Sequence, residues 1–178
     1  MRGQQELPSK WPALSLTAAG GLLRVLPHPP NLAPVGAMSL FAGANLNGWQ
    51  AYLVPLLIMA LTDPILGMMH GFAPFSRETV LIYGSFLISV AIGRRLRGKQ
   101  TAGRIGVAAV LCAVQFYLIT NSSTWLLGQM YPHTVAGLAA CYVAALPFFG
   151  YTLIGNLFYS AFFFGAHFWL TRRQLARA

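Results

Sequence analysis

One carboxylate, Asp63, lies in the second half of an almost wholly apolar run, Val54-Pro-Leu-Leu-Ile-Met-Ala-Leu-Thr-Asp-Pro-Ile-Leu-Gly-Met-Met-His70. The chain has only three acidic residues, and the other two, Glu6 and Glu78, lie outside any apolar run. A charged side chain in a membrane-length segment costs roughly 2.5–3.5 kcal/mol on insertion scales. We therefore expect Asp63 to face a partner, a cavity or a ligand.

The composition indicates an integral membrane protein made of α-helices. Hydrophobic residues make up 56% of the 178-residue chain and charged residues only 8%, whereas a soluble domain carries about 25% charged residues. The apolar runs are continuous, unlike the alternating segments of about ten residues that form a membrane β-barrel. We expect residues 1–178 to form a single membrane domain, with no room for a soluble catalytic domain.

The net charge of +9 is interpreted as a topology signal. The Lys and Arg residues cluster at the ends of the apolar runs, where such residues mark the cytoplasmic side of a membrane protein. The charge therefore does not predict a nucleic-acid partner, and membrane lipids are the expected surroundings of the chain.

Breaks at Pro, Gly and Asn divide the apolar sequence into candidate helices. Six of them are predicted to span a membrane, at residues 11–26, 33–46, 49–69, 78–92, 105–119 and 148–170. The remaining segment, 135–146, would reach only about 18 Å as a helix, too short for a hydrocarbon core of about 30 Å. We predict a short re-entrant or interfacial helix there.

The positive-inside rule supports six spans. If the basic cluster at 94–104 lies in the cytoplasm, six spans also place Arg2, Lys10 and the C-terminal arginines on that side. A seventh span would put the C-terminal arginines outside, against the rule. Both termini are therefore predicted to be cytoplasmic.

The predicted topology places two opposite charges at one depth. Counted from the cytoplasmic start of each span, Asp63 lies about 21 Å and Arg24 about 20 Å into the membrane. Pairing would relieve the cost of both charges. The pair could lock the bundle or form the wall of a binding site. Asn156 and Asn121 lie near the same level, and both suit either the cap of a broken helix or a ligand contact.

Further polar and aromatic residues lie in loops on the outer side. With the four residues above, they make a candidate substrate-binding set that faces outward, whereas the inner half of the bundle is nearly bare of polar groups. The histidines lack the paired spacing of metal sites, so no metal is predicted. The loop residues are His28, Asn31, His70, Trp125, Tyr131 and His133.

The sequence contains no constellation that points to catalysis. It has no paired carboxylates, no phosphate-binding Gly-rich loop before a Lys and no zinc-protease helix. A substrate-capture subunit is the preferred interpretation, and we do not expect an enzyme. The alternatives are a membrane assembly or scaffold protein without a small ligand and, as a weaker candidate, an enzyme that modifies lipids.

Several motifs resemble those of a known family. They are Arg24-Val-Leu-Pro-His-Pro-Pro-Asn-Leu-Ala-Pro-Val-Gly36, Phe41-Ala-Gly-Ala44, Ile119-Thr-Asn121, Tyr131-Pro-His-Thr134 and Thr152-Leu-Ile-Gly155. The chain resembles a bacterial family of small uncharacterised multi-pass membrane proteins, a domain of unknown function. The resemblance runs from about residue 20 to residue 166 and implies the bacterial cytoplasmic (inner) membrane as the location.

That family is similar in layout to the S components of energy-coupling-factor (ECF) vitamin transporters, which have six helices and an outer ligand pocket. The likeness rests on size, topology and the motif Pro30-Asn-Leu-Ala-Pro-Val-Gly-Ala37. It implies uptake of a vitamin or related micronutrient, with a transmembrane coupling subunit and its ATPases as partners. It also implies that the small residues Ala13, Thr17 and Gly21 form the docking face for that subunit.

A corrinoid is one ligand that the resemblance suggests. Its cobalt would favour an imidazole ligand, and His70 is the histidine expected nearest to the pocket mouth. No other cofactor is expected. The family pattern has Asp where this chain has Asn156, so the resemblance does not imply a cationic substrate here.

Overall fold

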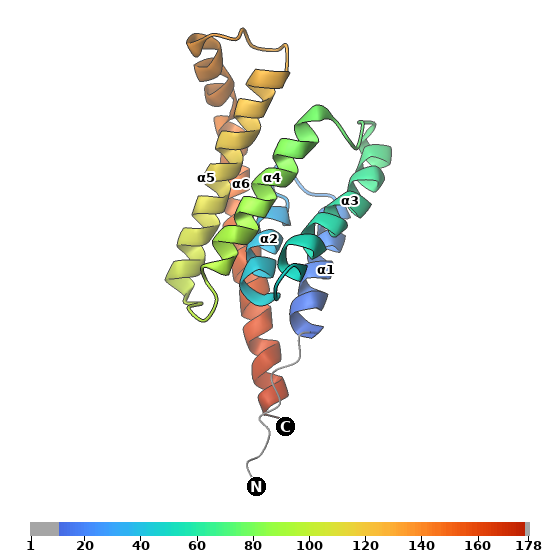
Figure 1. Ribbon diagram of the computed structural model, residues 1–178, viewed down its shortest axis with the longest axis vertical. Helices are drawn as coiled ribbons and strands as arrows, with labels where there is room; N and C mark the ends of the chain where they lie inside the picture. Colours follow the sequence, from blue (N-terminus) through green and yellow to red (C-terminus); the bar gives the residue numbers. More distant parts are fainter. Residues whose placement is uncertain (1–10, 177–178) are drawn as a thin grey trace.

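Six α-helices and no strand form in residues 11–176, the part of the chain that the computed structural model describes. The helices alternate in direction, so α1 begins and α6 ends at the same end of the bundle (Figure 1). Their bounds are α1 Trp11–Val25, α2 Val35–Asn45, α3 Gln50–His70, α4 Arg77–Arg94, α5 Ala102–Leu127 and α6 Val135–Leu175.

Local capping explains where several helices begin and end. Ser76 and Thr79 form a capping box at the start of α4, and the hydroxyls of Thr101 and Thr134 accept backbone N–H groups at the starts of α5 and α6. These hydroxyls satisfy donors that the first helical turn leaves unpaired. Gly71 ends α3 with a φ of 72°, in the left-handed region that glycine adopts without strain.

The short helix α2 lies at the centre of the bundle and packs against all five other helices. Residues 35–44 are all buried, and Phe41 packs against the rings of Phe163 and Phe164 on α6. The Gly and Ala residues of this segment allow the neighbouring helices to come close. With 11 residues, α2 is only about 16 Å long. It is too short to cross a membrane and instead forms the core of the bundle.

Two glycines allow α2 and α4 to cross in direct backbone contact. A Cβ atom on Gly43 would lie 2.1 Å from the carbonyl oxygen of Val90, and one on Gly93 would lie 2.1 Å from that of Leu40. Any side chain at either position would force the helices apart. This contact fixes α2 inside the bundle.

Three helices, α3, α5 and α6, are long and apolar enough to cross a membrane. Only 28%, 22% and 11% of the residues in their most apolar stretches are buried inside the protein. The remaining apolar side chains face outward over areas that a soluble monomer rarely exposes. The length of these three helices, their apolar composition and the exposure of their apolar side chains are typical of a helical membrane protein.

The prediction of a separate short helix at 135–146 is wrong. Residues 135–175 form one helix, α6, which continues through Pro147 and is about 62 Å long. A proline removes one backbone donor, and here the helix is held against α5 on both sides of it, with Tyr117 contacting the rings of both Tyr142 and Phe149. Helix α5 likewise runs past residue 119 to Leu127. Both helices extend beyond the α3–α4 turn (Figure 1).

Candidate functional site

The predicted pair of charges is confirmed. The guanidinium of Arg24, on α1, forms an ion pair with the carboxylate of Asp63, on α3. Asp63 is only 7% exposed. Arg24 also donates to the hydroxyl of Thr62 at 2.5 Å and to the carbonyl oxygen of Met59 at 3.5 Å. Estimates of depth along separate spans therefore brought the correct partners together.

A third helix joins this pair through a residue that the sequence did not reveal as a partner. The hydroxyl of Tyr83, on α4, donates to the other carboxylate oxygen of Asp63 at 2.5 Å. The available signal was a single phenol within the apolar run 78–92. Both oxygens of Asp63 thus have partners, and the network joins α1, α3 and α4.

Beside this network lies a cavity made of two adjoining hollows of about 160 and 260 Å³. Together they reach the size of a small-ligand site, about 300–1,000 Å³. Four residues line both hollows, which shows that they adjoin: Asn31, Ile82, Phe116 and Thr152. Arg24 and Asn156 line the smaller hollow, and Asn121 lines the larger one.

Asn156 is a polar residue of the cavity wall whose side chain has no partner. It lies in the middle of α6, is 3% exposed, and its side chain makes no hydrogen bond to any group in residues 11–176. Its amide has two donors and one acceptor, and because the residue lines the smaller hollow these groups are open to a ligand there. Gly36 makes the space for it, since a Cβ there would lie 2.3 Å from the Asn156 Oδ1 atom.

Two more asparagines add polar groups at the cavity. Asn31 stands in the turn before α2 with a φ of 65°, a left-handed conformation that asparagine tolerates better than most residues. Asn121 donates its amide hydrogen to the Tyr117 carbonyl at 2.8 Å, so its Oδ1 atom is free to accept. Arg24, Asn31, Asn121 and Asn156, four residues of the predicted set, therefore converge on one cavity.

Asp63 and two of the predicted histidines do not line this cavity. Asp63 lies behind Arg24 and positions its guanidinium. The two ring nitrogens of His28 lie 3.2 Å from the Arg24 carbonyl oxygen and 3.0 Å from the Pro29 carbonyl oxygen, and a neutral ring donates to one of them. His70, at the end of α3, bonds to the Leu66 carbonyl at 3.1 Å, so both imidazoles are used in local contacts.

The remaining predicted residues gather at the turn between α5 and α6. Trp125 donates its indole N–H to the Pro132 carbonyl at 3.0 Å and meets the His133 ring edge-on at 5.5 Å. Tyr131 lies in the same turn. None of the three lines the cavity, because α5 and α6 extend further than predicted and carry this turn away from it.

The three residues of the predicted docking face on α1 pack inside the chain. Ala13 is 3% exposed and Thr17 is fully buried, and a Cβ on Gly21 would lie 2.3 Å from the Ile58 side chain of α3. The small residues bring α1 close to helices of its own chain. A face of small residues predicts that another helix packs closely against it, but it does not identify that helix.

Sequence reasoning missed most of the apolar cavity wall. Aromatic side chains from α4, α5 and α6 make up much of it, and in a chain of apolar spans no local signal separates them from lipid-facing residues. Thr152 was visible in the motif Thr152-Leu-Ile-Gly155, but not as a lining residue. The missed wall residues include Phe86, Phe116, Tyr117, Phe148 and Phe149.

Chemically, the cavity suits a small molecule with a polar edge and an apolar or aromatic body. Amide and guanidinium groups can pair with the polar edge, while the phenylalanine rings can stack on the body. Within residues 11–176, no three His, Cys, Asp or Glu side chains are placed to hold a metal ion together.

Comparison with curated proteins and with solved structures gave no match in either case. A family match covers residues 5–177, nearly the whole chain, and agrees with the resemblance noted in the sequence motifs. The family's description assigns it no function. The chain therefore belongs to DUF6580, a family of unknown function.

Proposed function

We propose that this chain is a substrate-binding membrane subunit that captures a small molecule, such as a vitamin or related micronutrient, from outside the cell. One observation carries the proposal: the side-chain amide of Asn156, a residue only 3% exposed, lines a cavity and has no hydrogen-bond partner within residues 11–176. A buried amide is normally paired. A ligand in the cavity would supply this partner.

The proposed topology places all six helices in the inner membrane of a bacterium, with both ends of the chain in the cytoplasm. Arg94, Arg104 and Arg172 lie at the end of the bundle where α1 begins and α6 ends, and basic residues favour the cytoplasmic side. The cavity lies toward the opposite end, where Arg24 lies in the last turn of α1 and Gly36 in the first turn of α2. It would therefore receive a ligand from outside.

The charges around the cavity favour a neutral or weakly charged substrate. Arg24 is already paired with Asp63, and the other polar wall groups are amides and hydroxyls. A corrinoid held by His70 is not part of the proposal, because His70 does not line the cavity. A chain of this size would need separate ATPases for active uptake, and any coupling subunit would dock on a face other than Ala13, Thr17 and Gly21.

A scaffold without a small ligand is the second candidate. It is favoured by the network of Arg24, Thr62, Asp63 and Tyr83, in which the charges are matched inside the protein. A scaffold would have a filled bundle, however, and the cavity beside Asn156 fits that expectation less well. A lipid-modifying enzyme is weaker still, because Asp63 already has partners on both oxygens and is not a free base.

Thermal stabilisation by ligands tests the proposal. A panel of vitamins should contain a compound that raises the Tm of the purified protein, since a ligand that binds only the folded state stabilises it. The Asn156→Leu variant should lose most of this shift because it keeps the side-chain size but removes the amide. Asn45→Leu, at the far end of α2, is the matched control and should retain the shift.

Two results would contradict the proposal. One is that no compound in the panel raises the Tm of the wild-type protein. The other is that Asn156→Leu responds to the active compound as strongly as the wild type does.

A further inference from the structure

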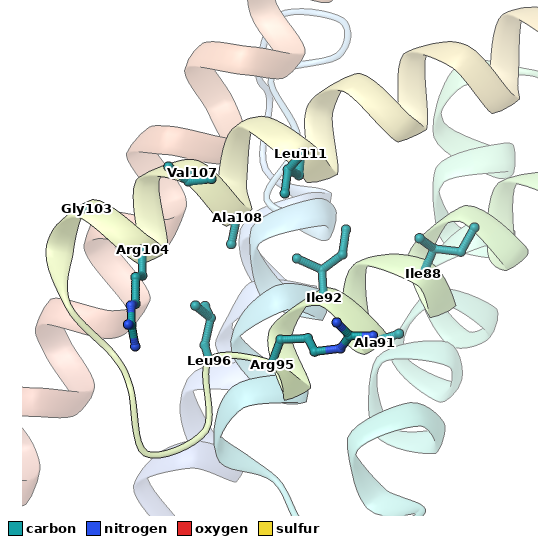
Figure 2. A pocket seen from close by; sticks show the side chains of 10 residues that line it. All are labelled: Ile88, Ala91, Ile92, Arg95, Leu96, Gly103, Arg104, Val107, Ala108 and Leu111. Atoms are coloured by element: carbon teal, nitrogen blue, oxygen red, sulfur yellow. The ribbon is translucent and has the colours of Figure 1, made fainter.

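A second hollow lies far from the cavity, between the end of α4 and the start of α5. It is a groove of about 610 Å³. Figure 2 shows Ile88 and Ile92 on one wall and Val107 and Leu111 on the other. Arg95 and Arg104 come from the two ends of the α4–α5 turn, and the Arg95 side chain runs along α4 toward Ala91. Ile88 on α4 lies seven positions before Arg95, and Leu111 on α5 lies seven positions after Arg104. The apolar part of the groove is therefore about 10 Å long.

The two arginines in this groove differ from their neighbours. Arg94 donates to the Gly48 carbonyl at 3.2 Å and lies over the Tyr52 ring, and Arg97 bonds to the side chain of Asn47. The side chains of Arg95 and Arg104 are exposed, and neither guanidinium makes a hydrogen bond or ion pair within residues 11–176. The guanidinium groups of Arg95 and Arg104 are therefore available to bind an anion that is not part of the protein.

The fold around these arginines gives no competing carboxylate. Within residues 11–176, Asp63 is paired with Arg24, and Glu78 lies at the other end of α4. The first turn of α5 begins between the two arginines and adds the partial positive charge of a helix start. The charge at this end of the groove is therefore positive throughout the described residues that surround it.

The arrangement matches an amphiphile lying along a membrane helix. Apolar walls run along α4 and α5, and α5 is long and apolar enough to cross a membrane. The charged end of the groove lies at the end of the bundle where α6 ends, the side proposed to be cytoplasmic. A phosphate at that level would meet Arg95 and Arg104, and an acyl chain would follow the walls toward the membrane centre.

We propose that this groove binds an anionic glycerophospholipid, with its phosphate at Arg95 and Arg104 and one acyl chain between α4 and α5. Guanidinium groups bind phosphate strongly through paired hydrogen bonds. The apolar walls require an attached chain, so free phosphate does not satisfy the site. This inference is independent of the outer cavity and its ligand.

Native mass spectrometry of the detergent-purified protein tests it, with dioleoylphosphatidylglycerol and dioleoylphosphatidylcholine as probes. The wild type should bind the anionic lipid more tightly than the zwitterionic one. In Arg95→Gln/Arg104→Gln, affinity for phosphatidylglycerol should fall roughly thirtyfold, since each charge near an anionic lipid is worth about fivefold. Arg172→Gln/Arg173→Gln removes the same charge from residues that lie over Phe168 and Trp169 and should bind as the wild type does.

A second variant tests the groove itself without changing the charge. Val107 is 63% exposed and lines the groove, whereas Val143 on α6 is 65% exposed and does not. Val107→Trp should block the acyl chain and weaken phosphatidylglycerol binding, while Val143→Trp should not. Any of three results would overturn the proposal. The wild type could bind the two lipids equally, the two double arginine variants could bind phosphatidylglycerol equally, or Val107→Trp could bind it as the wild type does.

Discussion

At the scale of single residues, Asp63 is explained by its neighbours. A carboxylate in an apolar helix is tolerated when it is paired, and Arg24 and Tyr83 supply that pairing from two other helices. The Arg24 pairing could be predicted because each of two spans carried one charge at the same depth. The Tyr83 contact could not be predicted. A tyrosine in an apolar run can either pair with a buried group or lie at the membrane interface, and its position in the sequence does not distinguish these two roles.

A double-mutant cycle measures this pairing. Arg24→Ala and Asp63→Ala should each destabilise the protein by about 3–5 kcal/mol, because each leaves a buried charge without its partner. The double variant should cost less than the sum of the two, by about 1–3 kcal/mol. The measurement is the free energy of unfolding of the wild type and the three variants in a mild detergent. Strict additivity would show that the two side chains act independently.

At the scale of helices, composition predicted the elements better than their ends. The segment at 33–46 was predicted as a membrane span, whereas α2 is an 11-residue helix whose residues 35–44 are all buried. The break expected at Pro147 did not occur, because the packing of α6 against α5 outweighs the loss of one backbone hydrogen bond. The small face of α1 was recognised, but its partner helix belongs to the same chain.

The crossing of α2 and α4 gives a prediction at this scale. Gly43→Ala should destabilise the bundle by about 1–3 kcal/mol, because the new methyl group would lie 2.1 Å from the Val90 carbonyl oxygen, which belongs to a rigid backbone. Gly84→Ala, on α4, is the matched control, since a Cβ there meets nothing within 4 Å. The Tm values of the two variants are compared. A Tm as low for Gly84→Ala as for Gly43→Ala would contradict the account.

At the scale of the whole molecule, the alternation of helices brings distant polar residues together. Arg24, Asn31, Asn121 and Asn156 come from separate parts of the sequence and share one cavity. The convergence of Arg24, Asn121 and Asn156 could be predicted from their depths in separate spans, and that of Asn31 from its place in an outer loop. The positions of His70, Trp125, Tyr131 and His133 could not, because they depend on how far each helix extends beyond the core, and α5 and α6 extend further than their apolar runs indicated.

The most direct test of a ligand-binding cavity is mass spectrometry of small molecules released from the protein after purification in a mild detergent. The wild type is predicted to carry one compound, in an amount approaching that of the protein, which is absent from Asn156→Leu and present in Asn45→Leu. Recovery of the same compounds, in the same amounts, from the wild type and Asn156→Leu would contradict the account.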